Sequence, residues 1–297
     1  MELTEVPCNI CDGKEVEVIL TPQVKNISFM EVFSAAGGVR GTQKIVKCKK
    51  CGLVFVSPRF PEEQIEKAYQ EAFDHGYSSQ ELGRKITFEN GIKLIERLYE
   101  KKGKILDIGA ANGVFVEVSK NRSWVAYGVE LSQELARSGK KKGLKFYQGT
   151  LEKQNFQNNF FDIITYWDVL EHVYDPKEEL TLANKLLKSG GLLLINYPDI
   201  GSLPARLTGK YWWFFLSVHL YYFSKNSLNN LLAKTGFKTI YSKRHWQYLE
   251  FGYLANMISL YSKIVSRILV YILKTLNVDR KLIPYYAGQS TIVARKL

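Results

Sequence analysis

Apolar runs and amphipathic stretches alternate through the second half of the chain. Five short apolar runs lie at 104–109, 125–130, 144–149, 160–168 and 191–198, and runs of this kind are typical of buried strands. Residues with helical spacing separate them near 112–120, 132–142 and 176–188. This alternation predicts an α/β domain with a parallel sheet that helices cover on both faces. A helix at 224–236 then leads to segments 237–243 and 288–297, which we expect to close the sheet as a strand pair.

The pattern before residue 104 is different. Residues 1–58 contain short β-type runs such as EVEVIL and LVFVSP, whereas residues 59–103 have helical spacing, with Pro61 and acids at a helix start. We therefore expect a small β module at 1–58, a helical cap or linker at 59–103, and the α/β domain at 104–297.

All four cysteines lie in the first module, as two CxxC pairs: Cys8, Cys11, Cys48 and Cys51. Two such pairs on tight turns can supply four thiolates to one tetrahedral ion, which predicts a zinc ribbon with a structural zinc site. Four thiolates close the coordination shell, so a catalytic zinc is disfavoured. The alternative is four reduced or disulfide-bonded cysteines.

The chain is basic, with 41 Lys and Arg against 29 Asp and Glu. This charge favours contact with phosphates, acidic sugars or an anionic membrane surface. The N-terminal sequence MELTEVPCNI has no pattern of a signal peptide, which predicts a cytoplasmic location.

The stretch KILDIGAANGVFVE predicts a strand, a glycine turn and a helix start. Its glycines, Gly109 and Gly113, allow a ligand to approach the backbone, but their spacing is not the GxGxxG of dinucleotide-binding turns. Asp107 before them would repel a pyrophosphate and can accept hydrogen bonds from an ammonium group. Glu130 ends the next strand, where a carboxylate can hold both hydroxyls of a ribose. A ligand with a ribose, a cationic amino acid part and no phosphate is S-adenosylmethionine.

Four motifs in order, LDIGAANG, GVELS, FDIITYWDVLEHVYDP and LLKSGGLLLINYP, resemble those of class I S-adenosylmethionine-dependent methyltransferases. The resemblance implies a Rossmann-like fold. It also implies that the turn contacts the methionine end of the cofactor, that Glu130 holds the ribose, and that Asp168 lies near the transferable methyl group. The cofactor-binding residues that it implies are Asp107, Gly109, Ala110, Gly113, Glu130, Leu131, Thr150, Leu151 and Asp168.

The run DVLEHVYDP resembles small-molecule methyltransferases, including those of ubiquinone and menaquinone biosynthesis. The cysteine pairs, HGYSS and HLYYFS together resemble a zinc-ribbon group that includes deoxysugar C-methyltransferases and enzymes found with cell-surface glycan pathways. That group has Glu before the histidine of HLYYFS, whereas this chain has Val218. We therefore expect methylation of an oxygen atom on a sugar or other small-molecule or lipid-linked acceptor.

Three residues are candidates for catalysis of that transfer. His219 and His172 are candidate bases, although His172 can instead hold a loop carbonyl. Tyr77 can close over the cofactor or donate to the acceptor, and its alternative is a surface loop tyrosine.

Two apolar features follow the predicted fifth strand. An aromatic insert at 205–223 can line the core or form an exposed apolar surface. Residues 252–276 predict one amphipathic helix with basic residues on its polar stripe. Such a helix suits peripheral contact at the inner membrane surface, or packing on the domain or on a second subunit.

Two other functions stay open. The basic segment KIVKCKKCG could dock an RNA or protein substrate for methylation, but it lacks interleaved aromatic residues, which argues against nucleic acid. A non-catalytic scaffold is disfavoured by the intact Asp107, Gly109, Gly113 and Glu130.

Overall fold

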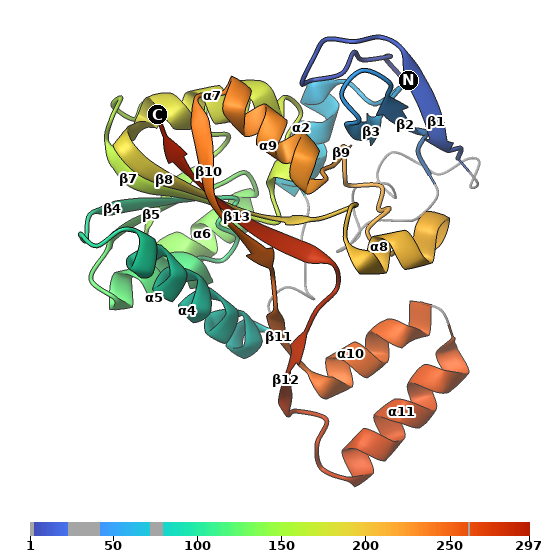
Figure 1. Ribbon diagram of the computed structural model, residues 1–297. Helices are drawn as coiled ribbons and strands as arrows, with labels where there is room; N and C mark the ends of the chain where they lie inside the picture. Colours follow the sequence, from blue (N-terminus) through green and yellow to red (C-terminus); the bar gives the residue numbers. More distant parts are fainter. Residues whose placement is uncertain (1–2, 23–41, 72–79, 261) are drawn as a thin grey trace.

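A seven-stranded sheet lies at the centre of the computed structural model, which describes residues 3–22, 42–71, 80–260 and 262–297 (Figure 1). Its strand order is β10-β13-β8-β7-β4-β5-β6. The strands are β4 (Lys104–Ile108), β5 (Val125–Glu130), β6 (Lys145–Gln148), β7 (Phe161–Trp167), β8 (Leu187–Pro198), β10 (Phe237–Arg244) and β13 (Gln289–Lys296). Neighbours from β8 to β6 are parallel.

The expected closing strand pair is confirmed. Strand β13 runs antiparallel to both β8 and β10, and Ile292 lies opposite Ile195 of β8. The sheet is therefore mixed, with a parallel centre and an antiparallel edge. This is the Rossmann-like methyltransferase fold that the sequence predicts.

Helices cover both faces of the sheet, and each face has its own apolar core. On one face α4 (Glu81–Leu98), α5 (Val114–Asn121) and α6 (Gln133–Lys141) pack around Phe115 and Ile163. On the other face α2 (Glu62–Glu71), α7 (Pro176–Leu186) and α9 (Lys225–Lys234) pack around Tyr166 and Leu193. Helix α7 ends at Leu186, two residues before the predicted end, because β8 begins at Leu187.

The glycine inside α4 has a packing role. A Cβ atom on Gly91 would lie 2.4 Å from the indole of Trp167, so only glycine lets this helix approach the end of β7.

The N-terminal β module receives a strand from the far part of the chain. Its sheet has the order β1 (Val16–Leu20), β2 (Ile45–Cys48), β3 (Val54–Val56) and β9 (Tyr221–Tyr222). The predicted aromatic insert supplies β9, and Tyr222 pairs with Val54. Before β9 the chain forms helix α8 (Leu203–Thr208) and the 3-10 helix η2 (Gly209–Tyr211). A loop follows, in which Trp212 is fully buried. Most of the insert's aromatic residues therefore line the core, although Tyr211 is exposed.

The prediction of one helix over 252–276 is wrong. The structure has α10 (Phe251–Met257), a short turn η3 (Ile258–Leu260) and α11 (Lys263–Thr275), which pack against each other. Ser262 separates them because its side chain caps α11 by accepting a hydrogen bond from the Val265 amide, at 3.3 Å. We call residues 251–281 the helical hairpin.

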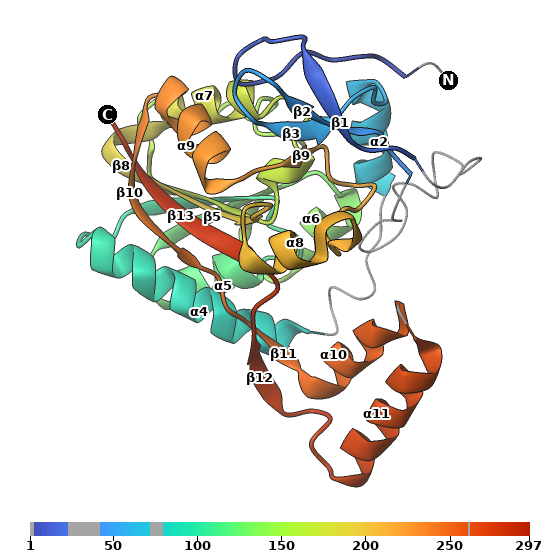
Figure 2. The ribbon, with the colours of Figure 1, turned by 45° about the vertical axis from the view of Figure 1, so that its right-hand side comes forward.

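The helical hairpin stands away from the sheet and its helices (Figures 1 and 2). The paired strands β11 (Gln247–Glu250) and β12 (Leu282–Tyr285) connect it to the rest. Within the described ranges, every helix is too short or too polar to pass through a bilayer.

Candidate functional site

A cavity of about 850 Å³ opens at the carboxyl ends of β4, β5 and β7, where ligands bind in open α/β sheets. We call it the cofactor pocket. Six of the predicted cofactor-binding residues line it: Gly109, Glu130, Leu131, Thr150, Leu151 and Asp168.

Glu130 is held rigidly at the wall of this pocket. One carboxylate oxygen accepts a hydrogen bond from the Ser132 amide and the other from the Ala111 amide, both at 2.8 Å. Burial raises the pKa of Glu130, and these amide hydrogen bonds oppose the shift. Each carboxylate oxygen can accept more than one hydrogen bond, so Glu130 keeps capacity for a diol.

The turn after β4 follows a backbone path that glycine permits. Gly109 has φ +66°, and a Cβ there would lie 2.5 Å from Val169. The Ala110 amide donates to the Val129 carbonyl at 3.0 Å, which ties the turn to β5. Gly113 has φ +88°, and its Cβ would lie 2.6 Å from Leu144. Ala110 and Gly113 thus shape the turn, and neither lines the cofactor pocket.

Asp107 lies behind the pocket wall rather than on it. Its carboxylate accepts a 2.7 Å hydrogen bond from the Thr165 hydroxyl in the neighbouring strand. Burial raises its pKa well above the ordinary range, and the nearby Glu130 carboxylate adds to the shift. In this structure the carboxylate joins β4 to β7, and a direct contact with an ammonium group stays a prediction.

Asp168 connects the pocket to the antiparallel edge of the sheet. Its Oδ1 accepts hydrogen bonds from the side-chain amides of Asn196 at 2.8 Å and Gln289 at 2.6 Å. Burial raises the pKa of Asp168 to about 6, against the opposing effects of Gln289 and the Arg84 charge. Gln289 belongs to the last strand, so no local motif around Asp168 could reveal this contact.

The two candidate bases lie together, with ring centroids 4.7 Å apart. His172 lines the cofactor pocket, whereas His219 is buried behind it. The Nδ1 atom of His172 lies 2.9 Å from the Val218 carbonyl, and that of His219 lies 2.8 Å from the Phe214 carbonyl. A carbonyl oxygen only accepts, so each Nδ1 carries the proton and each Nε2 is left as an acceptor.

Burial keeps both imidazoles neutral. It lowers the pKa of His172 to about 4 and that of His219 well below its ordinary range. Their Nε2 atoms therefore retain lone pairs throughout the neutral pH range.

Sequence reasoning missed two residues beside these histidines. The Tyr69 hydroxyl lies 2.7 Å from Nδ1 of His172 and donates to the Val218 carbonyl at 2.9 Å. Glu171 is buried, and neither carboxylate oxygen has a hydrogen-bond partner within the described part of the chain. Glu171, His172 and His219 lie close enough together to hold a metal ion. An acid beside a histidine in LEHV was the only available signal, whereas Tyr69 had none.

Tyr77 lies outside the described residues, so its predicted role stays a prediction. One further observation shows that the lining of the cofactor pocket is compatible with the predicted methyl donor. The Thr150 hydroxyl is buried without a hydrogen-bond partner among the described atoms, on the side where the resemblance places the adenine. An unsatisfied hydroxyl and a carboxylate with spare acceptor capacity in one cavity suit a nucleoside.

The four cysteines come together as the sequence predicts. Their sulfur atoms all lie within 4.8 Å of one another, with Cys8 3.3 Å from Cys51 and Cys11 3.5 Å from Cys48. A tetrahedral site with metal–sulfur bonds of about 2.3 Å has sulfur separations of about 3.8 Å. A Cβ on Gly13 would lie 3.3 Å from the Cys11 sulfur, so glycine leaves room for this cluster.

Comparison with known proteins is consistent with this architecture. A family model described as a methyltransferase domain matches residues 83–242, more than half of the chain. An uncharacterised protein of Methanocaldococcus jannaschii is 28% identical over 139 residues, which are 47% of this chain and 63% of that protein. A ubiquinone biosynthesis O-methyltransferase of Vibrio atlanticus is 34% identical over 105 residues, 32% of this chain and 43% of that enzyme. These matches thus span less than two thirds of either relative's length.

A crystal structure of a SAM-dependent methyltransferase from Archaeoglobus fulgidus superposes with a TM-score of 0.52 at 17% identity. The superposition covers 75% of this chain and 100% of that one. At this level of identity the likeness shows a shared fold.

Proposed function

Because the chain belongs to the methyltransferase domain family, we propose that it transfers a methyl group from S-adenosylmethionine to an oxygen of a sugar or other small-molecule or lipid-linked acceptor. The observation that carries this proposal is the cofactor pocket, in which Glu130 is fixed by two backbone amides. When bound, the cofactor supplies an electrophilic methyl group.

The residues of the pocket perform separate tasks in this proposal. Glu130 accepts hydrogen bonds from the ribose hydroxyls, while Thr150 and Leu151 contact the adenine. His172 accepts the proton of the acceptor hydroxyl at Nε2, because its Nδ1 is already committed to a carbonyl. A base with a pKa of about 4 is weak, so orientation of the acceptor supplies much of the rate.

His219 is a positioning residue in this scheme. It packs against His172 with the rings at 75°, away from the pocket wall, and thus limits how far the His172 ring can turn. Asp168, which Asn196 and Gln289 hold in place, lines the cofactor pocket together with His172.

Two experiments test the proposal in order. Calorimetry with S-adenosylhomocysteine should give binding to the wild-type chain, and absence of binding would leave only the non-catalytic scaffold. Labelled cofactor is then added with fractionated cell extract. Label should enter sugars, glycans or lipids, whereas label in RNA or protein would replace this acceptor class with a macromolecule.

The base assignment needs its own variant. His172→Gln should lower kcat at least tenfold while affinity for S-adenosylhomocysteine stays near the wild-type value. Near-normal turnover of this variant would exclude His172 as the base and leave His219 to be tested by the same substitution.

We further propose that the cysteine cluster holds a structural zinc ion. The support is the set of four converging sulfurs on two turns, of which Gly13 and Gly52 are parts. Gly52 has φ +77°, a conformation that glycine adopts without strain. The ion would stabilise the β module to which β9 also belongs.

A third proposal concerns the membrane surface. Helix α11 exposes apolar side chains on one face: Ile264, Val265, Ile268, Tyr271 and Ile272 are 44–72% exposed. Residues 251–281 contain five basic residues and one acid. An exposed apolar face beside net positive charge suits shallow insertion into an anionic bilayer, at the inner membrane surface.

Sedimentation with vesicles tests this surface. The protein should sediment with vesicles of anionic phospholipid and stay in the supernatant with zwitterionic ones. Ile268→Asp should abolish sedimentation, whereas Leu207→Asp, at a residue 77% exposed outside the hairpin, should not. Equal sedimentation of the two variants would contradict the proposal, and a concentration-dependent dimer that Ile268→Asp dissociates would identify the occupant as a second copy.

A further inference from the structure

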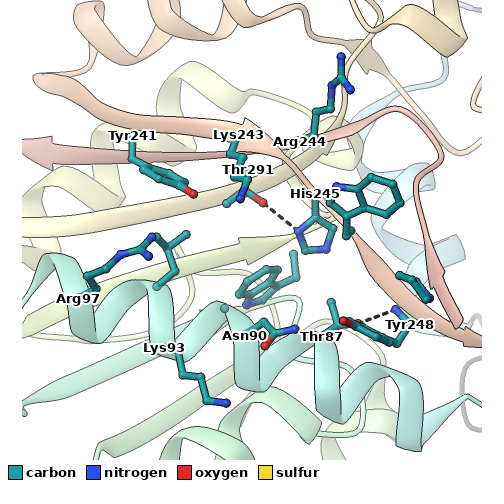
Figure 3. Close-up of a pocket in the computed structure, with 15 residues that line it drawn as sticks. Thr87, Asn90, Lys93, Arg97, Tyr241, Lys243, Arg244, His245, Tyr248 and Thr291 are labelled. Carbon is teal, nitrogen blue, oxygen red and sulfur yellow. Dashed lines mark hydrogen bonds between the residues drawn. The ribbon is translucent and has the colours of Figure 1, made fainter. Parts of the chain in front are cut away.

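A second cavity lies on the face of the sheet that α4 covers, between α4 and the strands β10 and β13 (Figure 3). Its volume is about 600 Å³, within the range of small-molecule sites. Within the described part of the chain, it has no lining residue in common with the cofactor pocket. We call it the basic pocket.

The charge of this cavity has one sign. Lys93 and Arg97 come from α4, and Lys243 and Arg244 come from β10, whereas the lining residues in the described ranges include no acid. None of these four cations has an ion-pair partner within 4.0 Å among the described residues. In Figure 3 the side chains of Lys93 and Arg244 point away from the space between α4 and β10, and the Arg244 guanidinium lies over the Tyr286 ring, 5.6 Å from its centroid. Arg97 and Lys243 are therefore the cations available to a ligand, and cations without ion-pair partners attract anions such as phosphate groups.

Polar side chains lie in the middle of the basic pocket. In Figure 3, Asn90 and His245 occupy the middle of the pocket, with Arg97 and Tyr241 at one end and Thr87 and Tyr248 at the other. The Nδ1 atom of His245 lies 2.9 Å from the Thr291 hydroxyl, and burial lowers the pKa of His245 to about 4. A neutral imidazole and an amide suit the hydroxyl or ring nitrogen of a ligand.

Aromatic side chains complete the lining. Trp246 is 48% exposed, and Tyr241 and Tyr248 lie at opposite ends of the pocket. The indole Nε1 of Trp167 is buried without a hydrogen-bond partner among the described atoms. Flat apolar surfaces beside unpaired cations recognise molecules that carry both a planar ring and phosphates.

We propose that the basic pocket binds a phosphorylated ligand with a planar ring, of the nucleoside diphosphate class, at a site separate from the methyl-donor pocket. Arg97 of α4 and Lys243 of β10 hold the phosphates, and the aromatic residues hold the ring. This site does not depend on the proposed methyl transfer, because the two pockets are lined by different residues.

Calorimetry on the full chain tests the proposal, with S-adenosylhomocysteine present at saturation so that adenine nucleotides cannot occupy the cofactor pocket. The probes are ADP, UDP, inorganic pyrophosphate and uridine. At least one nucleoside diphosphate should bind with a Kd below 1 mM, and pyrophosphate and uridine should each bind at least tenfold more weakly.

Matched variants assign the binding to this pocket. Arg97→Gln with Lys243→Gln should weaken nucleoside diphosphate binding at least tenfold. The control pair Lys101→Gln with Lys238→Gln removes the same charge outside the pocket and should leave the Kd unchanged. All variants should have the circular dichroism spectrum and Tm of the wild type, which shows that they are folded whether or not the chain binds S-adenosylhomocysteine.

Three results would overturn the proposal. They are the absence of nucleoside diphosphate binding, equal loss in the pocket and control pairs, and pyrophosphate binding as tight as that of the nucleotides. The last would mean that the cations bind any small anion.

Discussion

The Nδ1 atom of His172 lies 2.9 Å from the carbonyl oxygen of Val218. The zinc-ribbon group that the sequence resembles has Glu at the position of Val218, and its absence favoured oxygen over carbon as the methylated atom. The structure shows that the residue still acts on His172 through its backbone, which any side chain at 218 would supply. The orientation of His172 is thus independent of the side chain at position 218.

The Tyr69 hydroxyl adds to this orientation, since it contacts both Nδ1 of His172 and the Val218 carbonyl. We expect Tyr69→Phe to lower kcat about 2- to 10-fold, the cost of one hydrogen bond, with unchanged affinity for S-adenosylhomocysteine. Steady-state kinetics with the identified acceptor measures this. Tyr99→Phe, which removes a hydroxyl bound to Asp162, is the control and should keep wild-type kcat. Equal effects of both variants would indicate general destabilisation.

The Glu130 carboxylate should dominate recognition of the ribose. Glu130→Gln replaces one acceptor oxygen by an amide that faces a backbone N–H, so we expect a 10- to 100-fold loss of S-adenosylhomocysteine affinity, about 1.4–2.8 kcal/mol. Calorimetry gives the value directly. Glu134→Gln, at an exposed position of α6, should bind normally. A Glu130→Gln protein with wild-type affinity would disprove the ribose assignment.

Substitution of Gly113 and of Gly143 distinguishes the backbone strain that a Cβ atom causes at positive φ from the overpacking that it causes. Both have positive φ, but a Cβ at Gly113 would lie 2.6 Å from Leu144, whereas Gly143 has open space. We expect Gly143→Ala to cost about 1–2 kcal/mol of unfolding free energy from backbone strain alone. Gly113→Ala should cost about 1–3 kcal/mol more from overpacking. Urea unfolding measures both, and equal losses would show that the packing relaxes freely.

Stability should depend on the ionisation of Asp168. Its pKa is raised to about 6 in the folded chain, against about 3.9 when unfolded, so the folded state binds the proton more tightly. Stability from this group is complete below pH 4 and is lost as pH rises to about 6, by up to about 3 kcal/mol. Asn does not ionise, so between pH 4 and 7.5 the wild type should lose unfolding free energy relative to Asp168→Asn. Parallel pH profiles would contradict the assignment.

Metal content tests the cysteine cluster. The purified protein should contain one zinc ion per chain, and Cys48→Ser should lose it and show a lower Tm, because four thiolates stabilise the module on which β9 pairs. Asp12→Asn is the control, since Asp12 has φ +57° and Asn tolerates that conformation. A metal-free wild type with an unchanged Tm after chelation would exclude a structural zinc.

The sequence by itself determined the central architecture. Apolar strands alternating with amphipathic helices required a sheet covered on both faces, and the spacing of Gly109, Gly113 and Glu130 marked one edge of it. These signals are local, because each depends on residues close in the chain. The two CxxC pairs likewise predicted a cluster, which needs only two turns to meet.

Only the tertiary structure decided which distant segments meet. Strand β9 joins the N-terminal sheet, Gln289 binds Asp168, and Tyr69 reaches His172, although 103 residues separate the last pair. It also placed Asp107 behind the pocket wall and divided residues 252–276 at Ser262 into two helices. Such contacts arise from the packing of whole elements, and a pattern of hydrophobic and polar positions records only that a residue is buried, not which partner buries it.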